Sequence, residues 1–130
     1  MGAAATAASV LVAGPASAAS WWGDPNSCSG AKTVVSKVVN NRTVEVRAGS
    51  CGGSQHGWGR IVGYGSGDYI RFEVDTNGDR VQDGASWYLA TNRNYTAGYP
   101  TASGSTRAFR ACFVTSSTAT CTSTNSTAWW

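Results

Sequence analysis

The sequence predicts an all-β fold, a small disulfide-stapled sandwich or barrel of about six to seven short antiparallel strands. Short runs of β-branched and aromatic residues alternate with polar residues and are separated by turn residues. Helical periodicity is nearly absent, and the chain contains 16 glycines together with many Ser and Thr residues. Four cysteines, an even number, are typical of a small secreted domain that depends on covalent links.

Residues 1–18 are predicted to be a secretory signal peptide. They are uncharged, their apolar centre is Val10-Leu11-Val12, and Ala16-Ser17-Ala18 offers small residues to a signal peptidase. The stretch is too short to span a membrane. No basic residue precedes Lys32, so the usual basic region is missing and the true start codon stays open. A disordered Ala-rich tail is the alternative, and the signal peptide predicts a secreted, extracellular protein.

The rest of the chain is predicted to be one domain with two distinctive ends. Residues 19–27 form an N-terminal arm, residues 28–114 the β domain, and residues 115–130 a Ser/Thr-rich tail that carries Cys121. This length is typical of a single domain. No internal repeat is apparent.

The first two strands are predicted to form a hairpin. Residues 33–39 are rich in Val, and across residues 42–47 Val44 and Val46 alternate with polar side chains. Asn40-Asn41 lies between them, and Asn tolerates the positive φ that a tight turn requires.

Four further strands are predicted, at residues 58–64, 69–75, 86–90 and 106–114. One face of the first of these carries Gly57, Gly59, Ile61 and Gly63, and the glycines indicate close approach of a facing aromatic side chain or of another backbone. In the second, Ile70, Phe72 and Val74 are expected to point into the core.

The four cysteines are predicted to form two disulfides. Three pairings exist, and we favour the one between sequence neighbours, Cys28–Cys51 and Cys112–Cys121. A zinc site is the weaker alternative, because no pair has C-x-x-C spacing and the chain has a single histidine.

The charge pattern argues against a nucleic-acid partner. The net charge is +3, and no run of basic residues interleaves with aromatic ones. No membrane partner is expected either, and a weak attraction to acidic cell-wall polymers is all that the charge supports.

The sequence predicts a protein that is not an enzyme. His56 is the single histidine, no Gly-x-Ser-x-Gly motif occurs, and the cysteines are expected to be oxidised. Glu45 and Glu73 could in principle be a glycosidase pair, since glycoside hydrolysis needs only two carboxylates. Glu45 lies on the polar face of an alternating strand, however, where a solvated Glu is the ordinary finding.

One loop has the spacing of a calcium site. Oxygen ligands stand at loop positions one, three, five and nine, namely Asp75, Asn77, Asp79 and Asp83. The segment resembles the Asp/Asn-rich calcium loops of dockerins, EF-hands and thrombospondin-type repeats. It departs from them at position six, where Arg80 replaces Gly, and at position twelve, where Ser86 replaces an acidic residue. A plain polar β-turn at residues 77–78 is the alternative, with no cofactor at all.

Six tryptophans are the other unusual feature. Trp58 and Trp87 lie within strand patterns and are expected in the core. The others stand at the ends of the chain, where residues are normally polar; they are Trp21, Trp22, Trp129 and Trp130. Either a partner covers them or they pack against their own domain, and Trp is the residue most enriched at binding hot spots.

Three segments together are similar to the YjfA-type small secreted proteins. They are the strand entry at residues 28–39, Thr43-Val44-Glu45-Val46-Arg47 followed by Cys51, and Trp58-Gly59-Arg60-Ile61. The similarity covers residues 28–64 well and is looser over Asn94-Tyr95 and residues 107–113.

The overall layout also resembles the small adaptor subunit of secreted umbrella-shaped toxin particles. The resemblance implies an adaptor that joins a lectin subunit to a large repeat-containing toxin subunit and inserts its N-terminal segment into a cleft of the lectin. Here that segment is the arm, with Trp21-Trp22-Gly23-Asp24-Pro25 as aromatic anchors and a stiffening Pro. The expected function is therefore a non-enzymatic secreted adaptor that bridges protein partners. The alternative is a carbohydrate or cell-wall binding module, assisted by calcium if the loop binds it.

Overall fold

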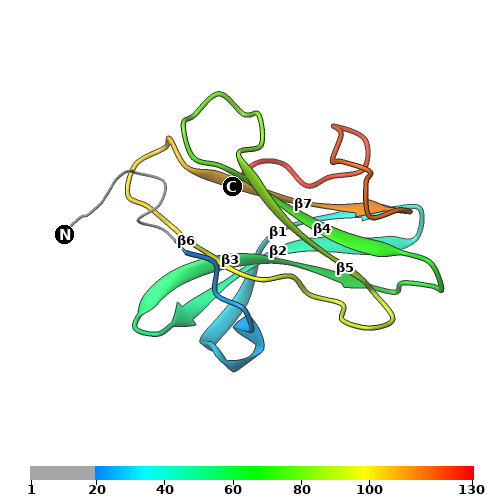
Figure 1. Ribbon diagram of the computed structural model, residues 1–130, viewed down its shortest axis with the longest axis horizontal. Coiled ribbons are helices and arrows are strands. Elements are labelled where there is room, and N and C mark those ends of the chain that lie inside the picture. The colour runs from blue at the N-terminus through cyan, green and yellow to red at the C-terminus, as the bar shows by residue number, and fades with distance from the viewer. Residues whose placement is uncertain (1–19) are drawn as a thin grey trace.

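The computed structural model describes residues 20–130, and the predicted signal peptide lies outside these residues. Two antiparallel sheets pack face to face, so the predicted disulfide-stapled β fold is confirmed as a sandwich (Figure 1). The strands are β1 (Ser29–Val39), β2 (Arg42–Cys51), β3 (Ser54–Val62), β4 (Tyr69–Asp75), β5 (Gly84–Leu89), β6 (Tyr99–Pro100) and β7 (Ala108–Val114).

One sheet has the strand order β1-β2-β3-β6 and the other the order β5-β4-β7. A short 3₁₀ helix, η2 (Pro25–Ser27), precedes β1 and is capped by the side chain of Asp24. Among residues 20–130, no helix is long and apolar enough to cross a membrane.

The predicted first hairpin is confirmed. Asn40 and Asn41 have φ values of 48° and 66°, and Val39 pairs directly with Arg42. Positive φ at both central residues is the conformation that matches the twist of two strands joined by a two-residue turn.

The strand expected at residues 58–64 begins earlier, at Ser54. Gly52 and Gly53 have φ values of 61° and 88° and form a second two-residue turn, which sets Cys51 opposite Ser54. The residues between this turn and Trp58, His56 among them, therefore belong to β3.

The sequence did not predict β6, the strand at the edge of the first sheet that pairs with β3. The chain from Asn94 to Pro100 runs beside β3, with backbone hydrogen bonds from Ile61 N to Asn94 O and from Thr96 N to Gly59 O, each 2.9 Å long. This segment contains Gly and Pro, which weaken a strand pattern, so its sequence carries no alternation signal.

The core lies between the two sheets and explains the glycines of β3. A Cβ atom on Gly57 would lie 2.6 Å from Cδ2 of Phe109, and one on Gly59 would lie 3.2 Å from Cβ of Phe72. The predicted close approach of an aromatic side chain is therefore confirmed. Both phenylalanines are fully buried.

Both predicted disulfides are present. Cys28–Cys51 ties the end of the arm to the end of β2, and Cys112–Cys121 ties the tail to β7. A disulfide in a small domain typically contributes about 2–4 kcal/mol, and two of them are consistent with an oxidising environment.

The C-terminal tail covers the outer edge of β7. Backbone hydrogen bonds join Phe113 N to Asn125 O and Thr127 N to Ala111 O. Trp130 and Phe109 exchange two more, each 2.8 Å long. The tail thus satisfies an edge that would otherwise expose unpaired backbone groups.

Candidate functional site

The predicted arm lies against its own domain. Trp22 and Gly98 exchange two backbone hydrogen bonds, of 2.7 and 2.8 Å, in an antiparallel bridge. The Trp22 ring lies 5.5 Å from the His56 ring and covers Gly52, where a Cβ atom would meet the indole at 2.7 Å. Trp22 is thus packed within the molecule, the second of the two arrangements open from the sequence.

The next arm residues are held just as closely. Arg93 donates from Nη2 to Gly23 O at 2.6 Å, and the Tyr95 hydroxyl donates to Asp24 Oδ1 at 3.0 Å. Burial and this hydrogen bond to a carboxylate raise the pKa of Tyr95. Pro25 is buried. These contacts, together with the nearby Cys28–Cys51 disulfide, hold the arm in one position against the domain.

Trp21 and Trp87 form an exposed aromatic surface. Trp21 packs against Tyr99, with ring centroids 4.9 Å apart, yet keeps 37% of its surface exposed. Trp87 is 45% exposed, so its expected place in the core is wrong. The two rings line one shallow pocket with Ala85, Ser86, Tyr88 and Ala97, and we call this the Trp21–Trp87 surface.

The exposure of Trp87 follows from the register of β5. Ile70 pairs with Tyr88 and Arg71 with Trp87, and since Ile70 faces the core, Trp87 faces outward beside Arg71. The Arg71 guanidinium carbon lies 5.3 Å from the Trp87 ring. Alternation alone gave no sign of which face of β5 is buried.

The C-terminal tryptophans lie elsewhere. The Trp130 ring packs 6.0 Å from Phe109, and the guanidinium carbon of Arg110 lies 4.5 Å from the Trp129 ring. Neither ring lines the pocket that Trp21 and Trp87 share. The structure therefore does not gather all of the predicted partner-binding residues into one surface.

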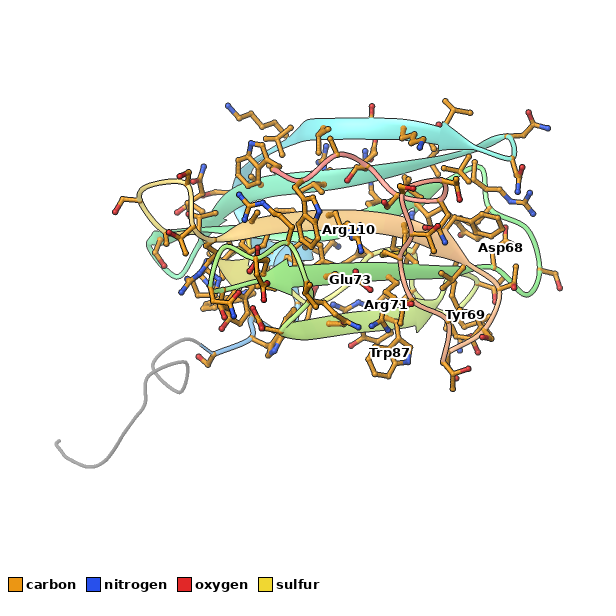
Figure 2. All side chains as sticks on the ribbon, turned by 90° about the horizontal axis from the view of Figure 1, so that it is seen from above. Asp68, Tyr69, Arg71, Glu73, Trp87 and Arg110 are labelled. Atoms are coloured by element: carbon orange, nitrogen blue, oxygen red, sulfur yellow. A yellow bond between two sulfur atoms is a disulfide. The ribbon has the colours of Figure 1, made fainter. Side chains whose placement is uncertain are left out.

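A buried ion-pair cluster lies on the outward side of the β5-β4-β7 sheet, and Figure 2 shows its members on neighbouring strands. Glu73, only 1% exposed, accepts from Arg71 Nε at 2.8 Å and from Arg110 Nε at 3.1 Å. The backbone amide of Cys121 is a third donor. The aromatic rings of Trp87 and Trp129 lie beside the two guanidinium groups.

The two glutamates do not flank a common site. Glu45 lies on the outward face of β2 and accepts from Arg60 at 2.6 Å, whereas Glu73 lies on the outward face of the opposite sheet. A glycosidase pair must reach one bond from two sides, so these carboxylates cannot serve that reaction together. His56 is buried, with Nδ1 2.9 Å from Ser54 O.

In the acidic loop after β4, the positively charged side chain of Arg80 pairs with one of the carboxylates that calcium would use. Asp75, Asp79 and Asp83 each offer an oxygen within 4.8 Å of the others. Arg80, at φ 59°, adopts the left-handed conformation usual for Gly at this position of calcium loops, and its Nη1 donates to Asp75 Oδ2 at 2.8 Å. The same guanidinium donates to two carbonyl oxygens of residues 105–106. Calcium binding stays a prediction, and the ion would have to compete with Arg80.

Asp75 makes a pH-dependent contribution to stability. Burial favours its neutral form, but hydrogen bonds from the Arg80 guanidinium and three backbone amides prevail and lower the pKa of Asp75 from 3.8 to about 2. The folded state therefore binds the proton more weakly than the unfolded chain. The difference corresponds to about 2 kcal/mol at pH 7, which is lost as the pH falls from about 5 towards 2.

We expect Asp75→Asn to flatten this acid dependence. Urea denaturation measured between pH 2 and pH 7 should show a smaller fall in the free energy of unfolding for the variant than for the wild type. Asp79→Asn is the matched control, because Asp79 is exposed and its carboxylate accepts a hydrogen bond from the backbone amide of Val81 rather than from Arg80. Equal acid dependence in the wild type and Asp75→Asn would contradict this account.

No protein-family model matches the chain, and no curated protein or solved structure does either.

Proposed function

We propose that the protein is a secreted, non-enzymatic adaptor that bridges protein partners in an extracellular complex. The observation that carries this proposal is the Trp21–Trp87 surface. Large aromatic side chains that stay exposed on a small domain are typical of protein-binding surfaces, and Trp dominates their hot spots. The arm contributes Trp21 to this surface, in keeping with the expected docking through the arm.

The arm supports docking as a rigid element. Because Trp22, Gly23 and Asp24 are bound to the domain, Trp21 is already positioned before any partner arrives. A pre-organised side chain loses little conformational entropy on binding, which favours affinity. Partners would therefore meet a formed surface rather than order a loose peptide.

The resemblance to umbrella-toxin adaptors suggests who the partners are. A lectin subunit and a repeat-containing toxin subunit are the proposed pair, and an adaptor needs two separate surfaces to hold both. Trp129 and Trp130 lie outside the Trp21–Trp87 pocket, and we propose them as part of the second surface.

We expect Trp87→Ala to weaken partner binding by at least about thirtyfold, the effect of losing a hot-spot residue worth about 2 kcal/mol. The exposed ring contributes little to the core, so the melting temperature should change by only a few degrees. The measurement is binding of the purified variants to the proposed secreted partners, a lectin subunit and a repeat-containing toxin subunit.

Tyr64→Ala is the matched control. Tyr64 is an aromatic residue of similar exposure, 39%, and it follows β3 outside the Trp21–Trp87 pocket. Its removal should leave binding unchanged. If Trp87→Ala and Tyr64→Ala bind equally well, the proposed surface is wrong.

A carbohydrate or cell-wall binding module is the second candidate. The observation that favours it is the exposed Trp87 ring beside a guanidinium group, an arrangement on which a sugar ring could stack. Sedimentation with isolated cell wall separates the two functions. Retention on cell wall in the absence of any protein partner, lost in Trp87→Ala, would favour this candidate over the adaptor.

A further inference from the structure

A second, more enclosed pocket is lined by other residues. It has a volume of about 280 Å³ and lies on the outward face of the β1-β2-β3-β6 sheet, beneath the arm. The residues that matter here are Asn26, Arg47, Trp58, Arg60, Asn94 and Tyr95. We call it the Arg47–Arg60 pocket.

The strand register brings the floor of this pocket together. Arg47 pairs with Trp58 across β2 and β3, and Arg60 pairs with Tyr95 on the next segment. Residues that pair directly across antiparallel strands point to the same face, and Arg47 and Arg60 are diagonal neighbours on it. Two guanidinium groups and two aromatic rings thus line one concavity.

The charges in the pocket are unbalanced. Arg60 donates to Glu45 at 2.6 Å, whereas Arg47 has no carboxylate partner anywhere in residues 20–130 and donates only to Thr33 Oγ1 at 3.0 Å. Burial and the nearby positive charge of Arg60 both lower the pKa of Arg47, more than Glu45 raises it. An arginine stays protonated in proteins, so the pocket carries two cations, of which only Arg60 is paired with a carboxylate.

The wall of the pocket is fixed in place. Asn26 belongs to η2, between the Asp24–Tyr95 hydrogen bond and the Cys28–Cys51 disulfide. Asn94 donates its side-chain amide to Ile61 O at 3.0 Å, which holds this side chain in place. The pocket therefore exists before a ligand binds.

We propose that the Arg47–Arg60 pocket binds one anionic sugar residue, carrying a carboxylate or a phosphate group. The planar guanidinium of Arg47 pairs with either group through two parallel hydrogen bonds. The amides of Asn26 and Asn94 bind hydroxyl groups, and Tyr95 offers a ring face. Sugar hydroxyls need such closely spaced polar groups, and the Tyr95 ring covers an apolar face of the sugar.

The shape of the pocket favours a sugar over a protein surface. A stable protein interface covers about 800 Å² on each partner and is nearly flat, whereas small-molecule sites are concave. A volume of about 280 Å³ is that of a site for one small unit rather than for a long segment.

Titration calorimetry of the intact secreted protein tests the proposal with four probes. They are glucuronic acid, glucose 6-phosphate, neutral glucose, and a peptide rich in Asp and Glu. We expect binding of at least one anionic sugar, none of glucose, and weaker binding of the peptide. Comparison of the first two probes distinguishes a carboxylate from a phosphate.

Arg47→Gln should weaken the anionic sugar at least about tenfold and leave the melting temperature nearly unchanged, because Arg47 forms no ion pair. Lys37→Gln removes the same charge from β1 outside the pocket and should not affect binding. Trp87→Ala should bind the sugar normally, so the proposal for the Arg47–Arg60 pocket is tested independently of the adaptor surface.

Several outcomes would overturn the proposal. They are no binding of either anionic sugar, equal binding of glucose, tighter binding of the acidic peptide, or an unchanged affinity in Arg47→Gln.

Discussion

Glu73→Ala should cost about 3–5 kcal/mol of unfolding free energy, because it removes the carboxylate that two buried guanidinium groups share. Arg71 is 5% exposed and Arg110 is only partly exposed, so neither recovers full hydration when Glu73 is lost. The backbone amide of Cys121 would lose its acceptor as well. Breaking a buried ion pair from one side leaves an uncompensated charge, which is costlier than never having formed the pair.

Glu45→Ala is the matched control. It removes the same residue type from an ion pair with Arg60, whose side chain is 34% exposed and can be rehydrated. The Glu45 side chain is 13% exposed, and a partly buried pair of this kind contributes about 1 kcal/mol. Urea denaturation of both variants gives the comparison, provided that the slope of unfolding free energy against urea stays the same.

Glu73→Gln isolates the charge from the shape. The amide keeps the volume of Glu73 but must turn an NH₂ group towards one of the two guanidinium groups, so we expect most of the loss to remain. If the losses in unfolding free energy of Glu73→Ala and Glu45→Ala differ by less than about 1 kcal/mol, the buried cluster does not stabilise the fold more than the Glu45–Arg60 pair does.

Much of the fold could be predicted because local patterns determined it. The hairpin at Asn40-Asn41 needs only a turn that tolerates positive φ between two alternating strands. Gly57 and Gly59 indicated a facing aromatic side chain, because Gly weakens a strand and is expected there mainly where a neighbouring group approaches the backbone closely. The two disulfides followed from sequence proximity within the pairs.

The surfaces could not be predicted in the same way, because they depend on which segment covers which face. Trp87 and Trp58 have similar strand patterns, yet the first is 45% exposed and the second 4%. Trp58 is covered because the arm and its disulfide lie over that face. Arg47 and Arg60 are 13 positions apart, and only the register of β2 against β3 makes them neighbours.

Trp22→Ala should lower the free energy of unfolding by about 3 kcal/mol and the melting temperature by about 10–20 °C. The Trp22 ring packs on His56 and Gly52, and its loss leaves a hole beneath the bridge to Gly98. Large-to-small changes at packed aromatic side chains cost this much because the surroundings relax only in part. Differential scanning calorimetry checks the result.

Trp21→Ala is the comparison that separates stability from binding. Trp21 is next to Trp22 in the chain, but 37% of its surface is exposed on the Trp21–Trp87 surface. Its removal should cost less stability than that of Trp22 and should weaken partner binding as Trp87→Ala does. Below its melting temperature, Trp22→Ala should still bind the partners, because the exposed rings remain. If folded Trp22→Ala loses partner binding while Trp21→Ala binds normally, the partner contacts Trp22 rather than Trp21, and the assignment of Trp21 to the binding surface is wrong.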